Sequence, residues 1–163
     1  MKIIGLISDT HAHLPASFSE FMTNCDEIWH AGDIGSIDLY RELQAFKPIR
    51  AVFGNIDEYF LRKELPEYTI FDCENVKVVM THIGGHPGKY STLSLELITK
   101  YHPKLHISGH SHILKAIYDK SNTLLHFNPG ACGIYGFHTK RTMMKFCIEN
   151  DRIFDLKIWE KDK

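Results

Sequence analysis

Five short polar clusters in the chain contain residue types that bind metal ions or transfer protons. Their donors are carboxylate oxygens, an amide oxygen and imidazole nitrogens, and no cysteine belongs to the set. Mixed nitrogen and oxygen donors of this kind suit Mn²⁺, Fe²⁺, Zn²⁺, Co²⁺ or Ni²⁺. In chain order, the clusters are Asp9-Thr10-His11, Gly32-Asp33, Gly54-Asn55-Ile56-Asp57, His82 and Gly109-His110-Ser111-His112.

The number of donors indicates two ions rather than one. The clusters supply seven donors, more than a four-coordinate site uses. Two ions about 3.5–4 Å apart that share a carboxylate would use such a set. Each cluster alone is weak evidence, because Gly-Asp and Gly-Asn pairs usually mark turns. Five clusters in this arrangement are difficult to explain as turns alone.

Each cluster directly follows a segment that is predicted to be a β-strand. These segments are short, apolar and rich in β-branched residues. The carboxyl ends of parallel strands form the ligand crevice of α/β sheets, so clusters far apart in sequence should meet there. The five expected strands cover residues 2–8, 26–30, 48–53, 76–81 and 104–108.

The remaining patterns define the fold class. Apolar residues at helical spacing predict helices over 17–25, 37–46 and 91–102, and the first half therefore has the order βαβαβ with parallel strands. We expect one α/β domain over residues 1–163, a two-sheet mixed β-sandwich flanked by helices. The second half favours hairpins, formed by 67–72 with 76–81, 114–119 with 123–127, and 139–148 with 152–159.

Composition limits the partners. The chain has 19 basic and 20 acidic residues, and this balance weighs against a long nucleic acid as partner. No apolar run approaches the roughly 18 residues that span a bilayer. The four cysteines form no C-x-x-C pair, and no signal peptide is recognisable. We therefore expect a cytoplasmic protein without a membrane partner, whose exposed hairpins could pair two copies into a homo-oligomer.

The five clusters resemble the motif series of the calcineurin-like metallophosphoesterases, especially their small, single-domain phosphodiesterase branch. That family reads D-x-H, G-D, G-N-x-[DE], H and G-H-x-H in this order. The resemblance extends through Asn128-Pro129-Gly130 and covers about residues 1–135. It implies a four-layer αββα sandwich.

The resemblance also implies roles for individual residues. The reaction would be hydrolysis of a small phosphate ester, a phosphodiester above all, by in-line attack of a hydroxide that bridges two metal ions. Mn²⁺ is the favoured ion, with Ni²⁺, Co²⁺, Fe²⁺ and Zn²⁺ as alternatives. The first ion would be held by Asp9, His11 and His112, the second by Asn55, His82 and His110, and Asp33 would bridge them.

One position departs from the family. Many members have a histidine after the motif asparagine, where it helps to protonate the leaving group, but this chain has Ile56. His86, in an expected flexible loop over 84–88, is our first candidate for this proton, and His13 is the second. For both, a solvated loop histidine remains the competing interpretation. Asp57 would orient a ligand histidine or cap its loop. Asn55, Asp57 and His86 form the candidate catalytic set.

Two other functions remain open. The same fold serves as a non-catalytic protein-interaction scaffold in one retromer subunit, which departs from the ligand pattern. A phosphomonoesterase or nucleotidase would use the same ligands. The histidines His102, His106 and His126 are expected on strand or helix edges, without assigned chemistry.

Overall fold

A computed structural model of the protein describes all residues from 1 to 163. Its first five-stranded sheet comprises β1 (Lys2–Ile7), β2 (Glu27–His30), β3 (Ile49–Ala51), β11 (Lys140–Glu149) and β12 (Arg152–Asp162). The strand order is β12-β11-β1-β2-β3. The strands β1, β2 and β3 run parallel, and β11 is antiparallel to β1, so the sheet is mixed.

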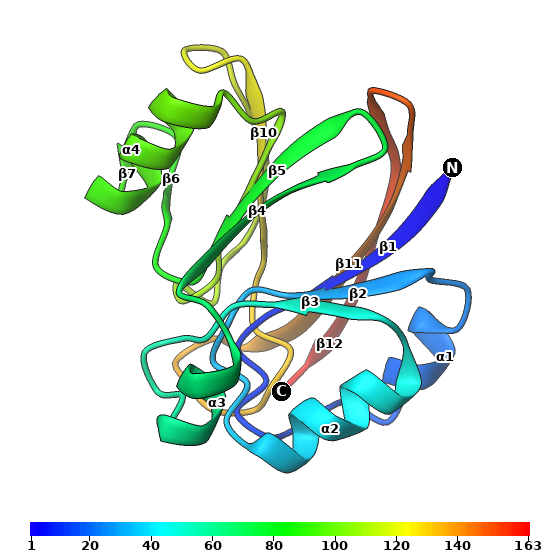
Figure 1. Cartoon of the computed structure of the whole chain (residues 1–163). Coiled ribbons are helices and arrows are strands. Elements are labelled where there is room, and N and C mark those ends of the chain that lie inside the picture. The colour runs from blue at the N-terminus through cyan, green and yellow to red at the C-terminus, as the bar shows by residue number, and fades with distance from the viewer.

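The second five-stranded sheet comprises β4 (Tyr68–Cys73), β5 (Val76–Thr81), β8 (Leu105–Ile107), β9 (Leu114–Asp119) and β10 (Leu124–Pro129). Its order is β4-β5-β8-β10-β9, and β5, β8 and β10 are parallel. Figure 1 shows the two sheets side by side. The predicted fold class, two mixed sheets flanked by helices, is confirmed.

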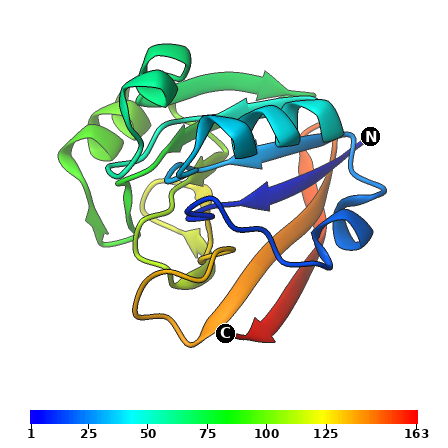
Figure 2. The ribbon, with the colours of Figure 1, turned by 90° about the horizontal axis from the view of Figure 1, so that it is seen from below.

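Helices cover the outer faces of both sheets. The helices α1 (Phe18–Met22), α2 (Ile37–Phe46) and α3 (Tyr59–Glu64) lie beyond the first sheet, where α1 and α2 face the viewer of Figure 2. Helix α4 (Thr92–Tyr101) lies on the other side of the molecule, with the hairpin of β6 (Gly85–His86) and β7 (Lys89–Tyr90) (Figure 1). The expected loop over 84–88 contains a strand instead, because Gly85 and His86 pair with Tyr90 and Lys89.

Strand alternation produces two cores. Ile4 and Leu6 of β1 point between the sheets, into a cluster that contains Trp29 and Phe146. Ile7 points the other way, into a second cluster formed with the helices. Because successive side chains of a strand face opposite sides, β1 is buried on both faces. No helix is both long enough and apolar enough to cross a membrane.

Two histidines on the second sheet are buried, although an edge position was expected for both. His106 of β8 and His126 of β10 are completely buried and pair in register. Their rings stack with a 22° interplanar angle, and their Nδ1 atoms lie 2.9 Å apart. His106 Nε2 also lies 2.9 Å from the Ser94 hydroxyl of α4. The edge prediction failed for these two because α4 and the β6–β7 hairpin cover this face.

Candidate metal centre

The loops that follow β1, β2, β3, β5 and β8 bring the predicted ligands together as two groups. In the first group, Asp9, His11 and His112 each offer one ligand atom, and these atoms lie within 4.8 Å of one another. The second group meets the same limit and consists of Asp33, His82 and His110.

Asp33 of the second group also lies close to the first group. Its Oδ2 is 3.2 Å from His82 Nε2 and 3.7 Å from His11 Nε2. The amide oxygen of Asn55, the seventh expected donor, is 3.0 Å from His82 Nε2. Asp9 Oδ1 is 3.1 Å from the Nε2 of His112, in its own group. The carboxylate of Asp33 is therefore positioned so that both groups could share it as a metal ligand.

Two atoms of the first group have no hydrogen-bond partner. Asp9 Oδ1 and His11 Nε2 are both buried and form no hydrogen bond, although other ligand atoms lie nearby. A buried polar atom without a partner costs about 1–3 kcal/mol, and such atoms are rare in folded proteins. Both atoms are electron-pair donors, and a cation between them would satisfy them. The residues present therefore fit a divalent metal ion.

The backbone of the centre is held in an unfavourable conformation. Five of the expected ligands have left-handed backbone angles, which are uncommon outside glycine although aspartate and histidine tolerate them better than most residues. Such residues cost about 1–3 kcal/mol each and gather at functional sites. Their φ angles are 53° for Asp9, 45° for His11, 56° for Asp33, 65° for His110 and 56° for His112.

Hydrogen bonds to the Nδ1 atoms orient two of the ligand histidines. His82 Nδ1–H donates to the carbonyl oxygen of Ala31 at 2.8 Å, which leaves the Nε2 lone pair facing the centre. His112 Nδ1 lies 3.0 Å from His138 Nδ1, and His138 Nε2–H donates to Gly133 O. His138 Nδ1 therefore accepts the hydrogen bond from His112 Nδ1–H, and the Nε2 lone pair of His112 also faces the centre. No motif spacing pointed to His138.

Charge and burial act in opposite directions within the second group. Burial opposes ionisation of Asp33, but hydrogen bonding with His82 and its positive charge outweigh burial and lower the pKa of Asp33. Burial also disfavours the charged form of His82, but Asp33 and Asp9 outweigh it and raise the pKa of that imidazole. The two carboxylates therefore favour positive charge at this position, which a divalent cation would also supply.

Glycines allow the loops to approach this closely. A Cβ at Gly54 would lie 1.9 Å from Asp33 Oδ1. Gly32 has a φ of 94°, and a Cβ there would lie 2.6 Å from His82 Nδ1. Side chains at these positions would displace Asp33 and His82.

Asp57 fastens the loop after β3 to the loop after β2. Its carboxylate accepts hydrogen bonds from the backbone N–H groups of Ile34 (3.1 Å), Gly35 (2.8 Å) and Gly54 (2.8 Å). Of the two roles expected for Asp57, this is the loop cap. The cap holds Asp33 and Asn55 on neighbouring loops at a fixed separation.

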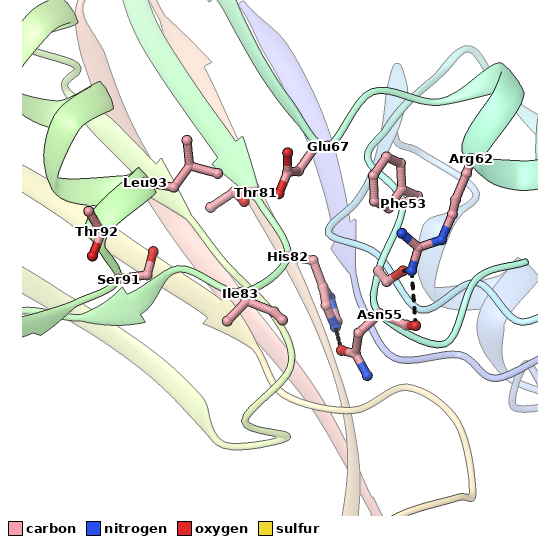
Figure 3. A pocket seen from close by; sticks show the side chains of 11 residues that line it. Phe53, Asn55, Arg62, Glu67, Thr81, His82, Ile83, Ser91, Thr92 and Leu93 are labelled. Carbon is pink, nitrogen blue, oxygen red and sulfur yellow. Dashed lines mark hydrogen bonds between the residues drawn. The ribbon is translucent and has the colours of Figure 1, made fainter.

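Arg62, which the sequence did not point to, holds the same loop from the other side. Its Nε donates to Asp57 O at 2.6 Å, and its Nη2 donates to Gly54 O at 3.2 Å. The same Nη2 donates to Asn55 O at 3.0 Å (Figure 3). Arg62 lies on α3, a helix that was not predicted. The only available signal was a basic residue a few positions after the third cluster.

The two candidate proton donors lie in different surroundings. His86 is half-buried and borders a hollow of about 310 Å³ together with His110. Its Nδ1–H donates to Pro87 O, so Nε2 is available. His13 is exposed, and its Nδ1–H donates to the carbonyl oxygen of His11. His86 remains the stronger candidate because it shares a hollow with an expected ligand.

Known proteins are similar to this chain in sequence or in fold. A "probable metallophosphoesterase" of Methanothermobacter thermautotrophicus is 30% identical over 115 residues, which are 68% of this chain and 66% of that protein. A phosphodiesterase of Methanocaldococcus jannaschii is 28% identical over 147 residues, 79% of this chain and 83% of that protein. The structure of Vps29 complexed with zinc from Entamoeba histolytica has a TM-score of 0.76 at 18% identity and covers 98% of both chains, which shows the fold alone.

The family model described as calcineurin-like phosphoesterase superfamily domain matches residues 1–151. This range includes all five polar clusters. The chain therefore belongs to the calcineurin-like phosphoesterase superfamily.

Proposed function

We propose that the protein is a phosphodiesterase that depends on two divalent metal ions. The observation that carries this proposal is the convergence of six of the expected ligands in two groups, the first of which contains two buried atoms without a hydrogen-bond partner, Asp9 Oδ1 and His11 Nε2. His126 Nε2 is also buried without a partner, but only Asp9 Oδ1 and His11 Nε2 lie in a group of ligand atoms that could hold a metal ion. Family membership adds the reaction class, hydrolysis of a phosphoric ester.

Each expected ligand has a place in this proposal. Mn²⁺ is the favoured ion, and Ni²⁺, Co²⁺, Fe²⁺ and Zn²⁺ suit the same donors. When bound, the two cations would lower the pKa of a water molecule and stabilise charge on the phosphoryl oxygens. One would be held by Asp9, His11 and His112, the other by Asn55, His82 and His110, with Asp33 shared.

The protein's own groups would bind the ester and manage the leaving-group proton. Asn55 is exposed, and its Nδ2 has no hydrogen-bond partner, so the amide can donate to a phosphoryl oxygen. His86 Nε2 would supply the proton to the departing oxygen, since Ile56 has none to give. If His86 donates inefficiently, esters with acidic leaving groups would react fastest.

Metal analysis followed by a substrate panel tests this function. We expect about two equivalents of divalent metal and hydrolysis of bis(p-nitrophenyl) phosphate that is faster than hydrolysis of p-nitrophenyl phosphate. His82→Ala should lose the activity. Faster monoester hydrolysis would identify a phosphomonoesterase. A protein loaded with Mn²⁺, Ni²⁺, Co²⁺ or Zn²⁺ that hydrolyses neither ester would contradict the proposal.

A second candidate function is a protein-interaction scaffold. The observation that favours it is a set of exposed apolar side chains near the centre, among them Tyr59 and Phe60 of α3 and Tyr135 and Phe137 of the loop after β10. A scaffold does not require tightly held metal. Absence of bound metal, together with inactivity towards both esters, would favour this function.

A further inference from the structure

A cleft of about 380 Å³ opens beside the candidate metal centre, and no motif predicted it (Figure 3). His82 and Asn55 line it, so the cleft begins at the second ligand group. The end of β5 forms one wall, the loop after β3 with α3 forms another, and the start of α4 forms a third. A group bound here would be adjacent to the reacting phosphorus.

One wall of the cleft carries a cation in a fixed position. The three hydrogen bonds of Arg62 to backbone carbonyls use its Nε and Nη2, and its guanidinium carbon lies 4.6 Å from the centre of the Phe53 ring. Its Nη1 has no hydrogen-bond partner, so two N–H donors remain for a ligand. Because Arg62 is already held in place, a ligand that contacts Nη1 loses little side-chain entropy.

The other walls supply an acceptor and apolar surface. Glu67 is exposed and forms no hydrogen bond or ion pair, so its carboxylate is free to accept hydrogen bonds. Phe53, Ile83 and Leu93 line the cleft with apolar atoms. A small alkyl group would contact the apolar side chains but would form no hydrogen bond with Arg62 or Glu67. A group with a flat apolar ring and both acceptor and donor atoms would satisfy all walls.

We propose that this cleft binds the organic group of the phosphodiester and selects a nucleoside over a small alkyl group. The base would pack on the apolar side chains with its acceptors towards Arg62 Nη1, and a sugar hydroxyl would donate to Glu67, as sugar hydroxyls do to carboxylates in nucleotide sites. The volume lies near the lower limit of the about 300–1,000 Å³ of ligand pockets, which fits one nucleoside. This inference rests on the proposed phosphodiesterase function.

Two esters with the same leaving group test the cleft. We expect the p-nitrophenyl ester of thymidine 5′-phosphate to have a KM about tenfold below that of methyl p-nitrophenyl phosphate. Leu93→Trp fills the cleft and should raise the KM of the thymidine ester about tenfold, while kcat/KM of the methyl ester changes less than about twofold. Leu95→Trp is the matched control, because Leu95 is exposed on the same helix and does not line the cleft. It should leave both esters unchanged.

The removal of a single acceptor provides a second variant. Glu67→Gln keeps the size of an exposed side chain, so the fold should be retained. We expect a KM increase of a few-fold for the thymidine ester only. Equal KM values for the two esters in the native protein, or equal effects of Leu93→Trp on both, would overturn the proposal.

A binding measurement separates this proposal from the proposed function. Saturation-transfer NMR with thymidine needs neither metal nor turnover. We expect transfer from the native protein and Leu95→Trp, and loss in Leu93→Trp. If the protein hydrolyses no ester but binds thymidine in this way, the phosphodiesterase function fails and the cleft assignment survives. If it hydrolyses both esters but thymidine shows no transfer, the cleft assignment fails.

Discussion

Two histidine clusters in this molecule have opposite electrostatics. In the candidate metal centre, His82 lies against Asp33 and Asp9, which raise its pKa despite its burial. On the outer face of the second sheet, burial lowers the pKa of His106 to about 3 and that of His126 to about 4. The comparison shows that carboxylates in contact, more than burial, decide whether a buried imidazole is suited to hold a cation.

Hydrogen bonding explains why the second cluster is structural. The Nδ1 atoms of His106 and His126 share one proton, and His106 Nε2 pairs with Ser94. The carboxylate of Asp119, which acts on His126, is already bound by the Tyr90 hydroxyl and by Asn122. Neutral rings therefore fill this face and join α4 to the sheet.

Asp33→Asn removes the carboxylate on which the comparison depends, and it should have the largest effect. Asparagine keeps the shape but loses the charge that two cations would share. We expect phosphodiester hydrolysis to fall by more than about 100-fold, beyond the usual cost of losing an outer-shell partner. Steady-state kinetics at saturating Mn²⁺ measures it, with the exposed Asp72→Asn as control. Activity within tenfold of native would contradict the shared role.

Removal of the metal ions should destabilise the candidate metal centre and leave the His106/His126 cluster unaffected. A ligand at 100 times its Kd stabilises the native state by about 2.7 kcal/mol, which corresponds to roughly 5–10 °C in Tm for a chain of this size. Thermal melts with and without a chelator measure this shift. Asp33→Asn should lose most of the shift and His126→Phe should retain it. An equal shift in both variants would place the metal elsewhere.

Acid should destabilise the second cluster. The unfolded histidines titrate near pH 6.5, and the folded ones near 3 and 4, so below pH 6.5 the unfolded state binds more protons. Stability therefore falls as pH falls. Between pH 7 and pH 6, His106 and His126 together should cost about 1.4 kcal/mol. Urea unfolding at the two pH values measures this, and the double variant His106→Leu/His126→Phe should reduce the dependence by that amount.

Tyr90→Phe makes a smaller change beside the same cluster. The Tyr90 hydroxyl donates to Asp119 at 2.9 Å, whereas the ring packs on His106. The variant keeps the ring and loses one hydrogen bond, so we expect a loss of about 1 kcal/mol in urea unfolding. A loss above about 3 kcal/mol would show that the hydroxyl has a larger role.

Thiol modification should have the smallest effect. Neither cluster contains a cysteine, and all four cysteines are buried and free. Burial raises the pKa of Cys25 and Cys73 to about 11 and that of Cys132 to about 12, so little reactive thiolate exists at neutral pH. Treatment of the native protein with iodoacetamide should leave the activity unchanged. Rapid labelling with loss of activity would contradict this.

The sequence predicted the elements whose signals are local. Short β-branched strands and the polar residues at their ends were sufficient to anticipate two mixed sheets and the meeting of Asp9 with His110, about 100 residues apart. Parallel pairing brings the ends of β1, β2 and β3 to one edge of the first sheet and the ends of β5 and β8 to one edge of the second. The packing of the two sheets against each other then brings these two edges together.

Features that depend on tertiary contacts could not be predicted. Helix α3 begins with Tyr59 and Phe60, both exposed, so it lacks an apolar face that periodicity could detect. Because this helix was not predicted, the role of Arg62 was not predicted either. His138 contacts His112 only because the loop after β10 folds back. The β6–β7 hairpin is rich in glycine, a composition that also describes flexible loops.

The left-handed backbone of the five ligands has a consequence for the amount of protein in a cell. At about 1 kcal/mol each, they offset roughly 5 kcal/mol of folding free energy, a large part of the 5–15 kcal/mol that a typical domain has. Chains without metal should therefore unfold more often and be degraded faster by proteases. We expect the steady-state abundance of this protein to follow the supply of divalent cations.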